Sequence, residues 1–325
     1  MSVNLALIGC GYWGRNHLRV LSEMNDVRLK YVCDALKPKI KIPQGVEYTS
    51  EFKDVLGDPT IEGVVIATPT ETHYNFARKF LEEGKHVFVE KPITTSSVEA
   101  EELCKIASHI NLQLMVGEIF RFNPAINFLK DLIEDGELGD LRYIESRRVG
   151  LGPIRTDVSV LWDLATHDIY ISNMLVGDKP VKVSYQGQSH NGHLDDIVCL
   201  NIKYDGSTGV MSTIYVNWEH PIKERKIIIG GTKKAALFDD VEPSEKIKIY
   251  DRGVDYQPAS GEFGEFQAAT RDGDIRIPKL KITQPLEEEL KHFVNCMLGE
   301  ESCRSDGRQG LQTVRILEAA EESRK

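Results

Sequence analysis

Long apolar runs and an excess of positive charge are both lacking in this sequence of 325 residues. No run approaches the roughly 20 apolar residues that a bilayer-spanning helix needs, and the first residues show neither the basic segment nor the cleavage site of a signal peptide. The 40 Lys and Arg stand against 50 Asp and Glu, so the formal net charge is -10, which disfavours binding to a nucleic-acid backbone. We therefore expect a cytoplasmic protein without nucleic-acid or membrane partners, although net charge leaves open a local basic pocket for a phosphorylated small molecule.

Cysteine is also sparse. Six cysteines stand at positions 10, 33, 104, 199, 296 and 303, without a CxxC pair or a regular spacing. In a chain of this size they indicate thiols in a reducing compartment and not a disulfide framework. His190 and His193 lie in a polar loop without acidic or cysteine partners at ligand spacing, so we predict no bound metal.

The first 120 residues alternate short apolar runs with helical patterns. Phe76, Ala77, Phe80 and Leu81 share one helical face, and that pattern stops at Gly84. Strands that alternate with helices predict βαβ units and a mostly parallel, doubly wound sheet. The expected strands lie at residues 5–8, 27–33, 63–67, 87–89 and 114–116.

The pattern changes near residues 121–124. Two hairpins are expected, one centred on Asp205-Gly206 and one on Gly230-Gly231, because strand-like runs flank each glycine-containing turn. We therefore predict two domains, a dinucleotide-binding domain of Rossmann type at residues 1–121 and an α+β domain with an open, mainly antiparallel sheet at residues 122–325. The other expected elements of the second domain are helices near 125–133, 161–175, 286–298 and 311–322 and a strand at 141–149.

A GxGxxG motif follows the first expected strand and opens the first helix. It consists of Gly9, Gly11 and Gly14, with Tyr12 and Trp13 between them. The first glycine permits a tight turn, the second lets a pyrophosphate approach the backbone, and the third allows close helix packing. The free N–H groups of the helix N-terminus then bind the phosphates, so the motif predicts a dinucleotide site.

Asp34 stands 20 residues after Gly14, at the end of the second expected strand. A carboxylate there accepts hydrogen bonds from the adenosine ribose and repels a 2′-phosphate, which favours NAD over NADP. A plain loop aspartate is the alternative. Lys37 and Lys39 lie close by, so NADP is not excluded.

An ordered set of further motifs is similar to the glucose–fructose oxidoreductase, inositol dehydrogenase and MocA family. The most specific parts are the tripeptide Glu90-Lys91-Pro92 and the Asp163-x-x-x-His167-Asp168 element. The resemblance covers essentially the whole chain. Its other parts are Thr68-Pro69-Thr70 with His73, Gly117-Glu118, and Arg121-Phe122-Asn123-Pro124.

The resemblance implies a nicotinamide cofactor, a sugar, inositol or sugar-nucleotide substrate, and a homo-oligomer formed through the outer face of the second sheet. Thr68, Pro69 and His73 then line the cofactor, and Glu90 and Lys91 lie beside the nicotinamide and its ribose. The Lys91–Pro92 bond is expected to be cis. Within the family, the nearest likeness is to sugar-nucleotide members such as UDP-N-acetylglucosaminuronate 3-dehydrogenases.

Oxidation of a secondary alcohol needs a base as well as a hydride acceptor. Asp163 and His167 are four residues apart on an expected helix and so share a face, where the carboxylate orients the imidazole. We predict His167 as the general acid/base, Asp163 as its orienter and Lys91 as the cation that stabilises the alkoxide. A surface contact between residues four apart is the alternative for the Asp163–His167 pair, and Asp168 is interpreted as structural.

Three arginines are candidates for a substrate carboxylate or diphosphate, because a guanidinium fork suits both groups. Arg148 is a predicted substrate-binding residue, together with Lys91, Asp163 and His167. Arg147 and Arg155 are further candidates. All three can equally be solvated charges at a strand edge. Trp162 and Trp218 are interpreted as core or interface residues, and Cys10 as a packing residue.

These observations predict an NAD-dependent oxidoreductase that transfers a hydride between a sugar ring carbon and nicotinamide. The predicted substrate is a UDP-linked sugar or uronic acid that reacts at C3. Inositol 2-dehydrogenase or a free-sugar dehydrogenase is the alternative enzyme. An NAD(H)-binding redox sensor without turnover is the non-enzyme alternative, and the presence of Lys91, Asp163 and His167 counts against it.

Overall fold

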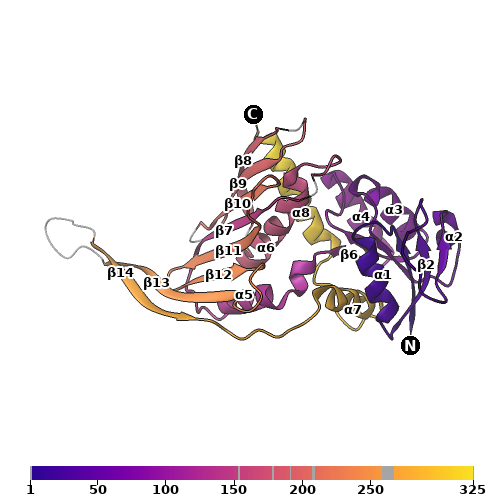
Figure 1. Ribbon diagram of the computed structural model, residues 1–325, viewed down its shortest axis with the longest axis horizontal. Helices are drawn as coiled ribbons and strands as arrows, with labels where there is room; N and C mark the ends of the chain where they lie inside the picture. The colour runs from indigo at the N-terminus through magenta and orange to yellow at the C-terminus, as the bar shows by residue number, and fades with distance from the viewer. Residues whose placement is uncertain are drawn as a thin grey trace. The chain divides into compact units, whose positions relative to one another are not determined.

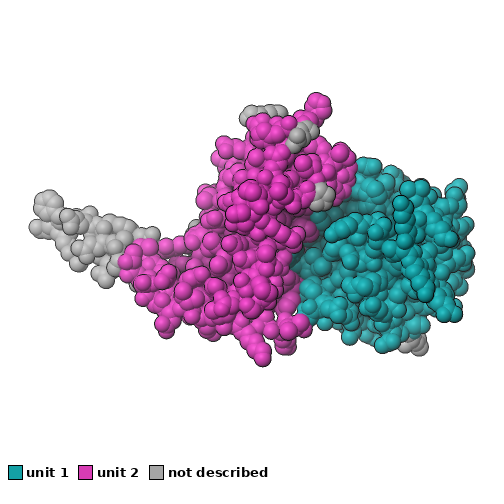
Figure 2. Space-filling view, in the orientation of Figure 1, with its two compact units in different colours: residues 1–122, 283–318 teal, residues 123–282, 319–325 magenta. Residues whose placement is uncertain are grey.

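The computed structural model divides the chain into two units (Figure 2). Unit 1 contains residues 1–122 and 283–318, and unit 2 contains residues 123–282 and 319–325. The residues that the structure describes are 2–152, 154–177, 179–190, 192–206, 209–257 and 267–324.

Unit 1 is built on a parallel sheet with the strand order β3-β2-β1-β4-β5-β6. Its central strands are buried on both faces, as the continuous apolar runs in the sequence require. The prediction of a parallel, doubly wound sheet is confirmed. The strands are β1 (Val3–Ile8), β2 (Val27–Cys33), β3 (Glu47–Thr49), β4 (Gly63–Ile66), β5 (His86–Glu90) and β6 (Leu114–Gly117).

Helices cover this sheet (Figure 1). The helices α3 and α4 pack on each other and on strands β4 to β6, while α1 packs on β1, β2 and α7. The helices of this unit are α1 (Gly14–Glu23), α2 (Phe52–Leu56), α3 (His73–Glu82), α4 (Ser97–His109) and α7 (Pro285–Met297), with 3-10 turns η1 (Thr70–Thr72) and η2 (Ile119–Phe122). The first residues of α8 (Gly307–Glu322) also belong to unit 1.

The position of α7 differs from the sequence expectation, which placed residues 283–318 in the second domain. Leu290 and Phe293 of α7 are fully buried in the same core cluster as Leu5 and Leu7 of β1. The apolar periodicity of a helix identifies its buried face but not the sheet against which that face packs. The chain therefore returns to unit 1 for residues 283–318 before its last residues join unit 2.

Unit 2 is built on an open sheet of strands in the order β14-β13-β12-β11-β7-β10-β9-β8. All neighbouring pairs are antiparallel except β7 and β10, which run parallel, so the prediction of a mainly antiparallel sheet is confirmed. The strands are β7 (Leu141–Val149), β8 (Pro180–Gln188), β9 (Ile197–Tyr204), β10 (Met211–Asn217), β11 (Glu224–Gly231), β12 (Ala235–Asp239), β13 (Ile247–Gln257) and β14 (Gln267–Arg276).

Two helices pack on this second sheet, α5 (Pro124–Glu134) on β12 and α6 (Thr166–Val176) on β7 and β10 (Figure 1). Asn123 caps α5, because its side chain accepts a hydrogen bond from the Ala125 N–H at 2.9 Å, and Pro124 takes the first helical position. Among the described residues, no helix combines the length and the apolar character needed to cross a bilayer.

Candidate active site

The glycine-rich turn joins β1 to α1, as the sequence predicts. Gly9 has a φ of +91°, and a Cβ there would lie 2.6 Å from the Ala67 carbonyl oxygen; a Cβ on Gly14 would lie 2.2 Å from the Gly9 oxygen. Backbone packing therefore requires both glycines. A Cβ on Gly11, in contrast, would meet no described atom within 4 Å. Packing does not explain Gly11, which agrees with the predicted close approach of a pyrophosphate to the backbone.

Glu90 connects this turn to the end of β5. Its Oε1 accepts hydrogen bonds from Trp13 Nε1 at 2.5 Å and from His17 Nε2 at 2.7 Å, and both Glu90 and His17 are buried. A Cβ on Gly117 would lie 3.1 Å from the Glu90 carboxyl carbon, so this glycine makes room for the carboxylate. The resemblance implied a position beside the nicotinamide; in the structure the carboxylate holds the turn and α1.

His17 was not identified from the sequence. It belongs to no motif, and the only signal is a histidine on the buried face of α1 next to Leu18 and Leu21. Trp13 is 37 % exposed and Tyr12 is 89 % exposed, so both remain accessible to a ligand at the turn.

Asp34 follows β2 and lies against the same turn. Its Oδ2 accepts the Cys10 N–H at 2.7 Å, and its Oδ1 accepts the Leu36 N–H at 3.0 Å. The two backbone donors fix the carboxylate next to the glycine-rich turn, where an adenosine ribose is expected. Burial raises the pKa of the Cys10 thiol, which agrees with a packing residue and not a nucleophile.

His73 joins the two segments that the resemblance placed at the cofactor. Its buried ring has Nδ1 at 2.8 Å from the Pro92 carbonyl oxygen and Nε2 at 2.9 Å from the Thr68 carbonyl oxygen. Both ring nitrogens therefore lie within hydrogen-bond distance of backbone carbonyl oxygens. The Lys91–Pro92 bond is cis, as expected. His73 thus fixes the backbone before Pro69 and after Lys91.

Two further carboxyl groups lie buried near Glu90. Burial raises the pKa of Glu118 well above its ordinary value; the Glu90 charge raises it further and the Lys91 charge opposes the shift. Burial likewise raises the pKa of Glu289 on α7, and the charges of Glu90 and Glu118 add to it. Burial thus favours the protonated form of both carboxyl groups. The sequence motif included Glu118 but not Glu289, whose only signal is a carboxylate on the apolar face of Leu286, Leu290 and Phe293.

In unit 2, Asp163 lies in a π-helical turn, Leu161–Ala165, that precedes α6. Its Oδ2 accepts a hydrogen bond from Trp218 Nε1 at 3.1 Å, and its Oδ1 lies 3.4 Å from Arg155 Nη1. His167 stands half-buried in the first turn of α6. Because a π turn holds more residues than an α turn, four-residue spacing does not align the two side chains as in a regular α-helix. The orientation of His167 by Asp163 stays a prediction.

Arg148, a predicted substrate-binding residue, forms a buried ion pair. Its Nε lies 2.7 Å from Asp168 Oδ2 and its Nη2 lies 3.2 Å from Asp168 Oδ1, and both side chains are buried. A guanidinium engaged in this way supports the packing of α6 on β7, so we assign Arg148 a structural role. The same contact agrees with the interpretation of Asp168.

The other candidates of unit 2 have partners as well. Arg147 pairs with Glu224 at 2.7 Å on the sheet, and Arg155 pairs with Asp157. Trp162 is buried and donates from Nε1 to Glu321 at 2.8 Å. His190 Nδ1 lies 2.8 Å from Asp196 Oδ1, and this carboxylate raises the pKa of His190.

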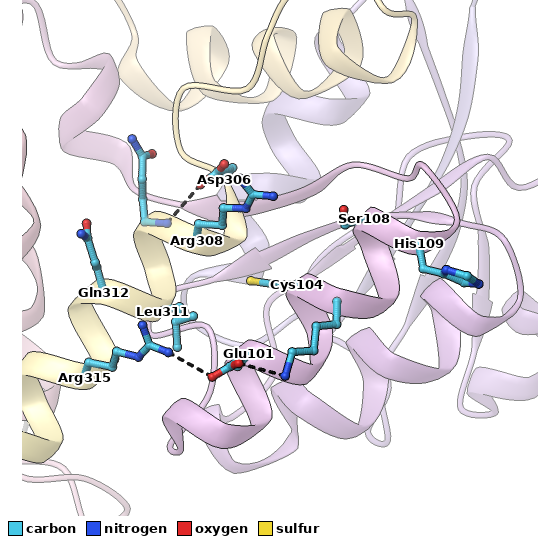
Figure 3. Close-up of a pocket in the computed structure, with 11 residues that line it drawn as sticks. Glu101, Cys104, Ser108, His109, Asp306, Arg308, Leu311, Gln312 and Arg315 are labelled. Atoms are coloured by element: carbon cyan, nitrogen blue, oxygen red, sulfur yellow. Dashed lines mark hydrogen bonds and ion pairs between the residues drawn. The ribbon is translucent and has the colours of Figure 1, made fainter.

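A surface hollow of about 770 Å³ lies in unit 1 between α4 and α8 (Figure 3). Glu101 binds Lys105 on the same helix at 2.9 Å and Arg315 of α8 at 3.0 Å. Its lining has mixed charge and contains none of the residues predicted for the cofactor or for catalysis. We do not include it in the active site.

Comparisons with known proteins identify both halves of the chain. Residues 3–118 match a family described as "Oxidoreductase family, NAD-binding Rossmann fold", and residues 126–237 match the "GFO/IDH/MocA C-terminal domain". The chain is 35% identical to UDP-N-acetylglucosamine 3-dehydrogenase of Acidithiobacillus ferrooxidans, over 80% of this chain and 77% of that protein. It is 25% identical to inositol 2-dehydrogenase of Rhizobium meliloti, over 98% and 96% of the two chains.

A solved structure shares the fold at lower identity. The WlbA dehydrogenase of Bordetella pertussis, solved in complex with NADH and UDP-GlcNAcA, is 21% identical and has a TM-score of 0.80 over 100% of this chain and 97% of that one.

Proposed function

Because the chain belongs to the GFO/IDH/MocA family of NAD-binding oxidoreductases, and is a dehydrogenase acting on CH–OH groups, we propose that its substrate is a nucleotide-linked sugar. The proposed reaction transfers a hydride between C3 of a UDP-linked sugar or uronic acid and nicotinamide. The observation that carries this choice is the 35% identity to a UDP-N-acetylglucosamine 3-dehydrogenase over most of both chains.

The residues of unit 1 fit NAD. The turn at Gly11 leaves room for a pyrophosphate, and the first turn of α1 carries Arg15 and no acidic side chain, so its N–H groups favour an anion. The Asp34 carboxylate suits the ribose hydroxyls. When bound, NAD accepts the hydride; the chain's own residues hold it and move the proton. We propose that Gly9, Gly11, Tyr12, Trp13, Gly14, Asp34, Thr68 and Pro69 contact the cofactor, with Glu90 and His73 positioning them.

We propose His167 as the general acid/base of the reaction and Lys91 as its electrostatic partner. His167 removes the hydroxyl proton as the hydride leaves the carbon, and the Lys91 ammonium stabilises the negative charge that develops on the oxygen. The raised pKa of the buried Glu118 supports this role for Lys91, because burial disfavours a Glu118 charge that would oppose the charge of the lysine. Asp163 is the proposed orienter of His167.

A substrate comparison tests the proposal. The purified protein is incubated with NAD and, separately, with UDP-N-acetylglucosamine, its uronic acid, the free sugars and myo-inositol, and the absorbance of reduced nicotinamide is followed. We expect turnover with a UDP-sugar, competition by UDP alone and a higher thermal midpoint in UDP. Turnover with inositol but with no UDP-sugar would instead establish the alternative, an inositol 2-dehydrogenase, which the 25% identity to such an enzyme favours.

Self-association stays a proposal. On the sheet face of unit 2, the side chains of Tyr143 and Met211 are directly paired across β7 and β10 and are 42 % and 50 % exposed. Their inward neighbours Ile144 and Ser212 are buried, so the exposed pair lies on the opposite face from the core. We propose a homo-oligomer through this face, which the sedimentation of the wild-type protein and of Met211→Asp would test.

A further inference from the structure

Three side chains with metal-binding atoms converge in unit 1, away from the predicted cofactor residues in the sequence. They are His292 and Cys296 of α7 and Cys303 of the loop that follows it, and their ligand atoms all lie within 4.8 Å of one another. His292 is 2 % exposed and Cys296 is 1 % exposed, while Cys303 is half-buried. The cluster therefore has two buried members and one member that solvent can reach.

Local structure explains why the three side chains meet. His292 and Cys296 are four residues apart on α7 and so project from one face. Gly299, with a φ of +75°, lets the chain turn back after the helix. The returning loop is fixed on β6, because the Ser305 carbonyl accepts the Val116 N–H at 2.8 Å. Cys303 is thereby held opposite the helix.

The orientation of His292 is set by a carboxylate. Its Nδ1 lies 2.5 Å from Glu301 Oε2, and Glu301 is held in turn by Asn295 Nδ2, which donates to its Oε1 at 2.7 Å. When Nδ1 carries the proton, the free lone pair of the ring is on Nε2, which lies 3.4 Å from Cys296 Sγ. A histidine that donates one ring N–H to a carboxylate and presents the other nitrogen is the usual arrangement at protein metal sites.

We propose that His292, Cys296 and Cys303 bind a divalent zinc-type cation, with water in the fourth position. Thiolate and imidazole are the ligands that such an ion prefers, and two thiolates balance its charge. Bonds of about 2.0 Å to nitrogen and about 2.3 Å to sulfur, at tetrahedral angles, separate the two ligand atoms by about 3.5 Å. The separation of 3.4 Å between His292 Nε2 and Cys296 Sγ matches this value.

The ion replaces one hydrogen bond. His292 Nε2 accepts a hydrogen bond from the Arg304 N–H at 3.0 Å. The ion would bind through the same lone pair and so displace this hydrogen bond. The charge of Arg304 does not oppose the ion directly, because its guanidinium lies over the Phe122 ring at 4.8 Å and near Glu301 at 3.8 Å. From the sequence we predicted no metal, because His190 and His193 lack acidic or cysteine partners at ligand spacing and no CxxC pair is present. The spacing of this cluster, H-x3-C-x6-C, does not contain such a pair either.

Cobalt(II) substitution tests the site. The full-length protein is reduced, stripped with a chelator and titrated with Co²⁺, and the thiolate-to-cobalt charge-transfer band is recorded. We expect one ion per chain, loss of the band when Zn²⁺ is added, and a higher thermal midpoint in Zn²⁺. The variant Cys303→Ser, which changes a half-buried loop residue, should lose most of the band while it keeps NAD binding.

Matched variants separate this site from other thiols. Cys104→Ser changes another half-buried thiol of unit 1 and should leave the band unchanged. Glu301→Gln should weaken Zn²⁺ binding about tenfold, because it loosens the orientation of His292. A folded wild-type protein without a thiolate-to-cobalt band, or an equal band in Cys303→Ser, would overturn the proposal and leave the cluster as hydrogen-bonded thiols.

Discussion

Trp13 Nε1 donates a hydrogen bond to Glu90 Oε1 at 2.5 Å, which ties the glycine-rich turn to the end of β5. The same oxygen accepts His17 Nε2 at 2.7 Å, so one carboxylate holds both the turn and α1. The residue before Lys91 therefore supports the glycine-rich turn, and two motifs that are 77 residues apart in sequence are joined by one hydrogen bond.

The variant Trp13→Phe should weaken NAD binding about tenfold. It removes a hydrogen bond to a charged acceptor, an interaction of about 1.5–3 kcal/mol, and so lowers the population of the binding-competent turn. Calorimetric titration with NAD measures the effect. The control Tyr74→Phe removes a similar bond, to Glu102 at 2.8 Å on α3 and α4, and should not change NAD binding. An unchanged affinity in Trp13→Phe would contradict this role of Glu90.

The variant Asp34→Asn should reduce the preference for NAD over NADP. The amide oxygen can still accept the Cys10 N–H, but the charge that repels a 2′-phosphate is gone. Two like charges about 4 Å apart repel by about 1–4 kcal/mol near a protein surface, so the ratio of kcat/KM values should fall about tenfold or more. Glu47→Gln, an exposed change on the neighbouring strand β3, is the control. An unaltered ratio would show that Asp34 does not face the ribose.

The variant Arg148→Met should destabilise the protein by about 3–5 kcal/mol, because it leaves the Asp168 carboxylate buried without its cation. Urea unfolding measures the loss, and Arg148→Met with Asp168→Leu should recover part of it. Arg142→Met, an exposed change on the same strand, should cost less than about 0.5 kcal/mol. Under folding conditions the KM of Arg148→Met for substrate should equal that of the wild type. A large rise in KM at normal stability would instead show that Arg148 binds substrate.

The variant Glu289→Gln should flatten the dependence of stability on pH. The folded-state pKa of Glu289 is raised above its ordinary value of 4.5, so the native state holds a proton that the unfolded state has released. The free energy of unfolding therefore falls as pH rises from 4.5 through the raised pKa, by up to about 1.4 kcal/mol per pH unit for this group. The amide cannot ionise, so the substitution removes this fall in the free energy of unfolding. At neutral pH the variant should therefore be more stable than the wild type.

Urea unfolding at several pH values checks this slope. Glu287→Gln changes an exposed carboxylate on the same helix and serves as the control. Equal slopes in the wild type and Glu289→Gln would mean that Glu289 ionises normally in the folded protein.

Local signals in the sequence predicted the parallel sheet and the cofactor turn. The buried strand β4, Gly63–Ile66, carries an unbroken apolar pattern. Gly9 and Gly14 of the turn are required because a Cβ at either position would clash with backbone atoms. Strands with mixed polarity were missed. The strand β3 has only three residues, and the long strands β13 and β14 carry several charged residues, so none of them shows a clear alternation of apolar and polar side chains.

Contacts between distant segments were not predictable from one sequence. The parallel pairing of β7 with β10, the return of α7 to the first sheet and the burial of Glu289 all depend on which partner an element meets. For the same reason Arg148 was interpreted as a ligand for substrate, although Asp168 lies 20 residues further along the chain. Residue type predicts the chemistry of a side chain, but its neighbours decide whether that chemistry is free for a substrate.

In the proposed mechanism, Lys91 stabilises the reacting oxygen of a sugar alcohol. The most direct test is the rate of NADH formation by Lys91→Ala at saturating NAD and UDP-sugar, compared with the wild type. We predict a loss of about a thousandfold, the upper range for one electrostatic donor, with NAD binding changed less than about twofold. A variant that reduces NAD at the wild-type rate would contradict the account.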